Sequence, residues 1–227
     1  MNKKIMTPNI PAALVEVADL AAHVADALDR RDDLDGLNIK NCSLDGHIAP
    51  GRRLDFCGCV FERCTLDVKK DRSCSFVDVV FKNCDLSNSD FFKSTFLRVS
   101  FVDCKAMGAN FAEAVFNNVT MSQSVFRYAN FSAAKMTTVK FLGCDLTNSA
   151  FEQCKLKDFE LEQCTLDSAE FSFTPLKGVD LTTCAIRGIR ANLPDLRGAV
   201  VASGQMIDLA GLLGVVVRDP LPRSRET

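Results

Sequence analysis

The most constraining feature of the sequence is a bulky apolar residue that returns at every fifth position. The run begins at Phe56, and from Phe76 to Ile186 it continues without an insertion or a deletion, with Ala106 as its weakest position. This period matches neither the 3.6-residue period of an amphipathic helix nor the two-residue period of an ordinary strand. It suits a chain that turns a corner every five residues and points two side chains of each five inward. Four such corners close one square coil, so each coil takes about 20 residues.

Stacked coils predict that residues 20 positions apart resemble one another. A first column holds cysteines and one serine: Cys64, Cys84, Cys104, Ser124, Cys144, Cys164 and Cys184. A second column holds valine except at Phe159, and a column of centres holds Phe91, Phe111, Phe131, Phe151 and Phe171. A random apolar period would not sort residue types in this way, whereas a β ladder would place identical side chains about 4.8 Å apart.

The cysteines and phenylalanines are accounted for by this pattern. Ten of the 11 cysteines lie at the inward position two residues before a centre, and Cys57 is the exception. Fourteen of the 17 phenylalanines are centres; Phe159 takes an inward valine slot, while Phe92 and Phe173 are expected to point outward. Stacked cysteines lack the spacing of a zinc site, and the chain has two histidines. We therefore expect the thiols to pack as small apolar groups, with no metal and no cofactor.

The composition excludes several classes of function. The formal net charge of −2 provides no global basic excess for binding nucleic acid directly. No apolar run reaches the length of a transmembrane helix, and the N-terminus lacks a secretory signal. An odd number of cysteines then favours reduced thiols in the cytoplasm. His23 and His47 fall in an expected helix and an expected loop, and no phosphate-binding glycine loop is present, so we expect no enzymatic activity.

The repeat breaks twice near its N-terminal end. Two residues are inserted around positions 47–53, and Asp71 fills a slot that should be apolar. We expect residues 67–73 to loop out, because burying Lys69 and Asp71 at core positions would be costly. If the first insertion replaces the same face, Leu44 falls in the Leu66 column. The pattern then predicts two adjacent loops that are either solvated or form a partner-contact patch, with the candidate residues Arg52, Arg53, Lys69, Lys70, Asp71 and Arg72.

Acidic residues gather near the other end. Positions 151 to 180 contain seven acidic residues and three lysines. They are either a solvated wall or a strip that imitates the phosphate backbone of a duplex and attracts a DNA-binding protein. The candidate DNA-mimic face consists of Glu152, Asp158, Glu160, Glu162, Asp167, Glu170 and Asp180.

The ends of a solenoid need caps, which suggests three segments. Residues 1–33 are expected to hold a tail and a capping helix over 11–31, where docking of a partner helix is an alternative; residues 34–201 form the solenoid. In residues 202–227 we expect a helix capped by Ser203 and ending near Gly214, a short strand and a charged tail. The apolar surface there predicts a two-fold dimer through Met206, Leu209, Leu212, Leu213, Val215, Val216 and Val217.

The repeat resembles the pentapeptide-repeat family, whose pattern is A(D/N)Lxx. The pattern stands here as Ala109-Asn110-Phe111, Ala129-Asn130-Phe131, Cys84-Asp85-Leu86 and Cys144-Asp145-Leu146. The resemblance covers about residues 34–201 and implies an all-β fold, a right-handed quadrilateral β-helix, with short capping helices at both ends.

Within that family, three stretches resemble the Qnr group of quinolone-resistance proteins. They are the projecting segment between Cys64 and Cys74, the stretch from Cys104 to Phe111, which resembles a CRAxGADF motif, and the C-terminal residues Leu196–Ala199, Gln205 and Leu212–Val217. The resemblance implies a rod-like homodimer that binds a type II topoisomerase, DNA gyrase or topoisomerase IV, and protects it from quinolones or other poisons. The alternatives are a rigid protein–protein interaction scaffold with an unrelated partner and an effector exported by a specialised route.

Overall fold

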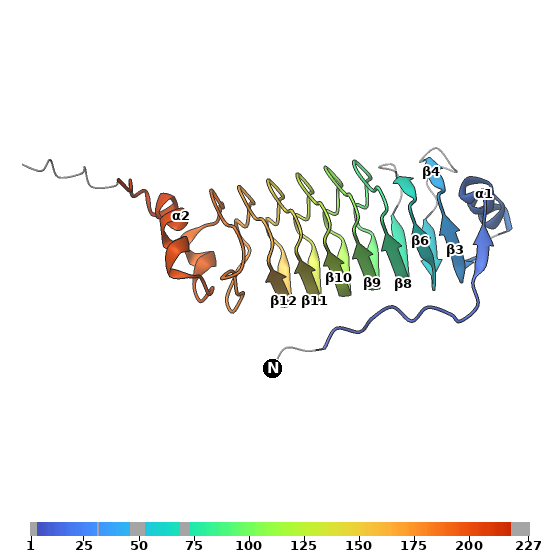
Figure 1. Cartoon of the computed structure of the whole chain (residues 1–227), viewed down its shortest axis with the longest axis horizontal. Helices are drawn as coiled ribbons and strands as arrows, with labels where there is room; N and C mark the ends of the chain where they lie inside the picture. Colours follow the sequence, from blue (N-terminus) through green and yellow to red (C-terminus); the bar gives the residue numbers. More distant parts are fainter. Residues whose placement is uncertain (1–3, 31, 46–52, 69–72, 219–227) are drawn as a thin grey trace, which may run out of the picture.

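The protein is a rod of stacked coils (Figure 1). The computed structural model describes residues 4–30, 32–45, 53–68 and 73–218. Near the N-terminus the elements are short: β1 Val15–Val17, α1 Leu20–Arg30, β2 Leu34–Asp35, β3 Leu37–Lys40, β4 Ser43–Asp45, β5 Leu54–Cys57, β6 Val60–Glu62 and β7 Thr65–Asp67. Five longer strands follow, β8 Cys74–Lys82, β9 Thr95–Val102, β10 Val115–Ser122, β11 Lys135–Leu142 and β12 Lys155–Glu162. The C-terminal end holds η1 Leu193–Leu196, η2 Ser203–Gln205, α2 Met206–Ala210 and η3 Gly211–Leu213.

The strands pair in parallel with the register that the sequence predicts. Phe96 lies beside Phe116, and Val119 beside Val139, each 20 positions further along the chain. The path β1-β3-β6-β8-β9-β10-β11-β12 runs through a ten-stranded sheet, and single bridges such as Asp90–Asn110 stack the other sides of the coil. The predicted quadrilateral β-helix is confirmed.

A corner residue with left-handed backbone geometry explains why the chain turns every five residues. From Asn83 to Gly178 the residue two places after each centre has a positive φ, for example 53° at Asn83 and 56° at Asn148. Glycine and asparagine adopt this conformation most easily. At Gly143 a β-carbon would also collide with the Gln123 Nε2 of the previous coil, so a side chain here would require the Gln123 side chain to move.

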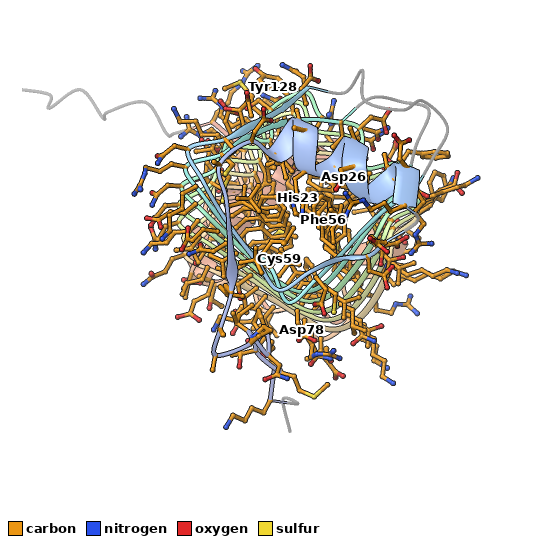
Figure 2. The ribbon with its side chains drawn as sticks, turned by 90° about the vertical axis from the view of Figure 1, so that its right-hand side faces the viewer. His23, Asp26, Phe56, Cys59, Asp78 and Tyr128 are labelled. Carbon is orange, nitrogen blue, oxygen red and sulfur yellow. The ribbon has the colours of Figure 1, made fainter. Side chains whose placement is uncertain are left out.

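The core consists of the predicted columns. Figure 2 looks along the rod, with Phe56 and Cys59 inside the ring of coils and Asp78 and Tyr128 outside. Phenylalanine rings stack face to face between coils, with 4.8 Å between the ring centroids of Phe151 and Phe171. Ten cysteines are buried and Cys57 is exposed, as predicted. Of the other exceptions, Phe159 is buried and Phe173 is exposed as expected, whereas Phe92 is half-buried.

The N-terminal helix is shorter than predicted. It begins at Leu20, where Asp19 Oδ1 accepts a hydrogen bond of 3.0 Å from the Ala22 N–H group and so caps it. Residues 15–17 form β1 instead, because two β-branched residues flank Glu16 and pair with the edge of β3. The buried residues of α1 are Leu20, Val24 and Ala27, and Leu28 packs against the core.

Two further expectations about local structure need correction. Residues 67–73 do not loop out as a unit, because β7 includes Asp67 and Val68 is buried with its carbonyl accepting from the Asp90 N–H group. At the C-terminus the residues from Val215 to Val217 form no strand, and Ser203 does not cap the helix through its side chain. The Gln205 amide closes the last coil, with its Nε2 donating to the carbonyls of Leu181 and Cys184. Leu44 does pair with Leu66, as predicted.

Candidate partner-binding surfaces

Little of the predicted basic patch belongs to the described residues. Arg53 is described, and its Nε lies 2.7 Å from Asp55 Oδ1. The Asp55 carboxylate therefore offsets the positive charge of Arg53. The other candidates, Arg52, Lys69, Lys70, Asp71 and Arg72, lie outside the described residues. The basic patch therefore stays a prediction.

The acidic residues are divided between different sides of the coil. Asp158, Glu160, Glu162 and Asp180 line one groove. The remaining three, Glu152, Asp167 and Glu170, occupy other positions of the coil, where Asp167 Oδ2 lies 3.7 Å from Arg187 Nη2 and Glu170 Oε2 lies 2.9 Å from Arg190 Nε. The seven acids are therefore not one continuous wall, because the square coil turns three of them away from the groove.

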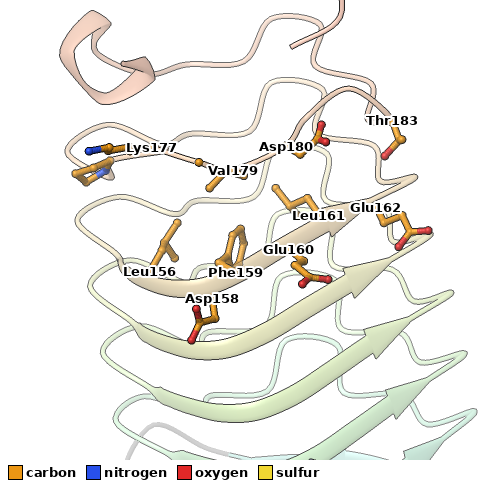
Figure 3. Close-up of a pocket in the computed structure, with 12 residues that line it drawn as sticks. Leu156, Asp158, Phe159, Glu160, Leu161, Glu162, Lys177, Val179, Asp180 and Thr183 are labelled. Atoms are coloured by element: carbon orange, nitrogen blue, oxygen red, sulfur yellow. The ribbon is translucent and has the colours of Figure 1, made fainter. Parts of the chain in front are cut away.

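The groove lies between β12 and residues 175–183 and has a volume of about 500 Å³ (Figure 3). Leu156, Phe159 and Leu161 form its apolar side, opposite Val179. In β11 the equivalent side chains are completely buried, whereas Phe159 is 8% exposed and Leu161 5% exposed. The core is thus accessible at this point of the rod, and carboxylates surround the opening.

The carboxylates of the groove are held in place by defined partners. Lys140 of β11 donates to Glu162 Oε2 and lies 3.6 Å from Glu160 Oε2; the bond to Glu162 raises the pKa of Lys140. Thr182 donates from its hydroxyl and its N–H group to Asp180 Oδ1, at 2.6 and 2.8 Å, which lowers the pKa of Asp180. The Lys140 ammonium group therefore offsets part of the charge of Glu160 and Glu162, whereas the lowered pKa of Asp180 favours its charged form.

An N-terminal segment covers part of the outside of the coils. Residues 4–14 run back along the rod in extended form (Figure 1). The Asn9 N–H group donates to Asp78 Oδ1 at 2.9 Å, and the Met6 N–H group donates to Asn118 Oδ1 at 3.0 Å. Arg98 binds the same Asp78 through Nε and Nη2, both at 2.6 Å. The sequence pattern does not predict this contact, because neither anchor belongs to the repeat's apolar positions.

The C-terminal end exposes apolar side chains. Met206, Leu213, Val215, Val216 and Val217 are each more than half exposed. Two of the predicted dimer residues, Leu209 and Leu212, pack against the core of their own chain instead. Ile207, which the prediction did not include, is 66% exposed and adds to the surface.

The thiols have structural roles. Cys154 Sγ donates to the Phe131 carbonyl at 3.1 Å, and burial raises the pKa of Cys154 to about 12. Burial, followed by the charge of Asp35, also raises the pKa of the exposed Cys57, so that thiol is not activated as a nucleophile. Among the described residues, no group of three or more histidine, cysteine, aspartate or glutamate side chains could hold a metal ion. No helix in the described ranges is long and apolar enough to span a membrane.

The family model for the pentapeptide repeat region matches residues 74–147 and 134–201. The chain belongs to the pentapeptide-repeat family. The matched ranges contain β8 to β12, the groove and η1, so the acidic groove is part of the repeat itself. A search of curated proteins finds none that matches this pentapeptide-repeat protein.

Solved structures of other proteins are similar to this pentapeptide-repeat protein at low identity. Full-length QnrB1, described as a plasmid-mediated fluoroquinolone resistance protein, is 21% identical, with 89% of this chain and 97% of that chain covered and a TM-score of 0.40. A pentapeptide repeat protein from the Arabidopsis thaliana thylakoid lumen is 24% identical over 44% of this chain and 66% of that chain, with a TM-score of 0.32. HetL of Nostoc sp. strain PCC 7120 is 14% identical over 76% and 90%, with a TM-score of 0.28.

Proposed function

We propose that this protein is a non-catalytic DNA mimic that binds a type II topoisomerase, DNA gyrase or topoisomerase IV, and protects it from quinolones or other topoisomerase poisons. The observation that carries the proposal is the set of carboxylates held on one side of a rigid rod, at Glu160, Glu162 and Asp180. Fixed negative charge of this kind attracts a DNA-binding surface by the electrostatics that attract phosphates. The stretches that resemble the Qnr group, above all Cys104 to Phe111, favour a topoisomerase over other DNA-binding proteins.

The C-terminal end supports action as a homodimer. Several exposed apolar side chains at one end, including Val216 at 77% exposed, are more typical of an interface than of a monomer surface. A two-fold dimer through this end would place the two rods end to end, with one acidic groove in each subunit. The exposed surface supports the dimer, which is part of the proposal.

A supercoiling assay tests the function. Gyrase is inhibited by a fixed quinolone concentration, and the full-length protein is titrated into the reaction. We expect supercoiled product to return. A variant with Glu160→Gln, Glu162→Gln and Asp180→Asn should need about tenfold more protein, because three exposed charge contacts contribute about 0.5 kcal/mol each. Glu113→Gln is the matched control, since Glu113 is an exposed acid outside the groove that pairs with Lys93 at 3.6 Å.

Two results would contradict the proposal. One is the absence of rescue with a quinolone and with a protein poison of gyrase, together with no capture of gyrase on immobilised protein. The other is equal rescue by the triple variant, which would separate protection from the acidic groove. Failure of both binding and rescue would favour the rigid interaction scaffold with an unrelated partner.

A further inference from the structure

The outer edge of β12 lacks the neighbour that every preceding strand of the solenoid has. β8 to β11 each pair with the following long strand, whereas β12 ends the sheet. Within this described part of the chain no bridge joins β12 to residues 175–182, although stacking resumes at once with the bridge Thr165–Ala185. The ladder is interrupted on one side of the coil only.

Pro175 removes one hydrogen bond at the point where the interruption begins. Lys135 and Lys155, its equivalents in the two previous coils, donate their N–H groups to the carbonyls of Ala114 and Ala134, both at 2.9 Å. Proline has no N–H group to donate to the Cys154 carbonyl. At the far end of β12 the Gln163 N–H group donates to the Thr183 hydroxyl, whereas the equivalent Gly143 donates to the Glu162 carbonyl.

The groove therefore presents main-chain groups as well as side chains. In the register of the earlier coils, the N–H groups of a centre and of the corner residue point to the next coil, as Phe126 does to Asp145 at 2.7 Å. The same positions in β12 are Leu156, Asp158 and Leu161, which line the groove. An uncovered edge of this kind is a template for another strand.

We propose that this open edge binds an extended segment of a protein partner, with alternating basic and apolar side chains, as an added strand. The apolar residues of the segment fill the space beside Leu156 and Phe159, and its lysines or arginines face the carboxylates at the rim. Charge complementarity favours a basic segment. Four acidic residues and one lysine, Lys177, line the groove, and Lys140 forms ion pairs with two of these acids. The proposal does not depend on the partner being a topoisomerase.

The same sheet already accepts such a segment at its other edge. Residues 15–17 add to β3 as β1, in parallel, with Val17 beside Ile39. This strand comes from outside the predicted repeat and carries the apolar–charged–apolar pattern Val-Glu-Val. A three-residue strand is thus sufficient to cover an edge of this solenoid, and a groove of about 500 Å³ has the volume of a ligand site.

Binding of designed peptides to the full-length protein tests the proposal, measured by fluorescence anisotropy. The probe is a labelled hexapeptide of alternating lysine and valine. A second peptide replaces lysine by glutamate, and a third keeps the lysines but carries N-methyl groups on alternate amides. We expect the first peptide to bind with a Kd below about 100 µM, and each of the others at least about tenfold more weakly.

Variants locate the site. Pro175→Lys restores the missing donor and should close the groove, so that peptide binding falls about tenfold or more. Glu160→Gln with Asp180→Asn should weaken binding, whereas the control Glu113→Gln should not. Equal binding of the N-methylated peptide would overturn strand addition, and no binding of the first peptide at about 1 mM would overturn the site. Neither measurement contains a topoisomerase, so this proposal and the proposed function can fail separately.

Discussion

The two edges of the ten-stranded sheet differ in whether another segment of the chain covers them. At the N-terminal edge the chain supplies β1, and α1 follows it across the end of the rod (Figure 2). The Cys42 thiol ties this cover to the coils by donating to the Val17 carbonyl at 3.5 Å. At the C-terminal edge β12 pairs with β11 alone, and a groove lies beyond it. One edge is closed by the chain itself and the other is open to a partner.

The difference shows how a solenoid can keep one edge strand unpaired and still avoid pairing with unintended strands. An unprotected flat edge invites association between copies of the chain. Here the edge lies within a groove, beside the coil that contains Pro175, and carboxylates such as Glu160 and Asp180 line it. Like charges on a second copy would repel, so the arrangement favours basic partners over self-association.

The largest expected effect is a difference in the free energy of unfolding between two core truncations. Replacing a phenylalanine by alanine should cost more in the closed interior than beside the open edge. Phe131 is completely buried and stacks on Phe151 at 4.8 Å, so Phe131→Ala should lower the free energy of unfolding by about 3–5 kcal/mol. Phe159→Ala should cost about 1–3 kcal/mol, because water in the groove can fill the space. Guanidinium unfolding measures both, with the 67%-exposed Phe173→Ala as the control. Equal costs at Phe131 and Phe159 would show that the groove is closed in solution.

Releasing β1 should leave β3 with an unpaired edge, so that both edges of the sheet would be open. Val17 in β1 is buried, and Val17→Asp would place a charge among apolar side chains, at a cost on the order of 3 kcal/mol. Release of β1 would also uncover β3 and cause association that increases with protein concentration. Light scattering and thermal unfolding measure the two effects. Val15→Asp is the control, because Val15 lies on the same strand and is 60% exposed; similar behaviour of both variants would argue against edge protection.

The sequence predicts the coil well because one physical rule repeats in it. Stacking of like side chains fixes the register, so the pairing of Phe96 with Phe116 follows from their separation along the chain. The corner residues carry a second signal, since glycine or asparagine often stands two places after a centre, as at Asn88 and Gly108. Fold and core therefore follow from the period alone.

The edges could not be predicted from that period. Residues 15–17 continue an apolar pattern that also fits a helix, and only pairing with β3 makes them a strand. The capping residue Asp19 is a local signal that would have placed the helix start correctly. At the other edge the apolar positions continue unbroken through Leu176 and Leu181, so the repeat looks intact. Pro175 removes a hydrogen bond from the ladder without changing the apolar pattern.

The smallest expected effect is a loosening of the N-terminal segment at acid pH. Arg98 and the Asn9 N–H group bind the Asp78 carboxylate and lower its pKa in the folded state. A lowered folded pKa means that the stabilisation is present above the unfolded value of about 3.9 and is lost as pH falls through the folded pKa. We therefore expect the Asn9 contact, worth about 1 kcal/mol, to be intact at neutral pH and to weaken below about pH 4.

The segment carries its own control for this prediction. Met6 is anchored by Asn118, whose amide does not titrate, so the amide signal of Asn9 in a nuclear magnetic resonance titration should move at higher pH than that of Met6. Asp78→Asn should reproduce the acid form of the Asn9 signal at neutral pH, because an amide cannot form the ion pair with Arg98. If both signals move together in the acid titration, the segment is released by general acid unfolding. In that case Asp78 would not hold the chain that leads into β1, and the closed edge would depend on β1 and α1 alone.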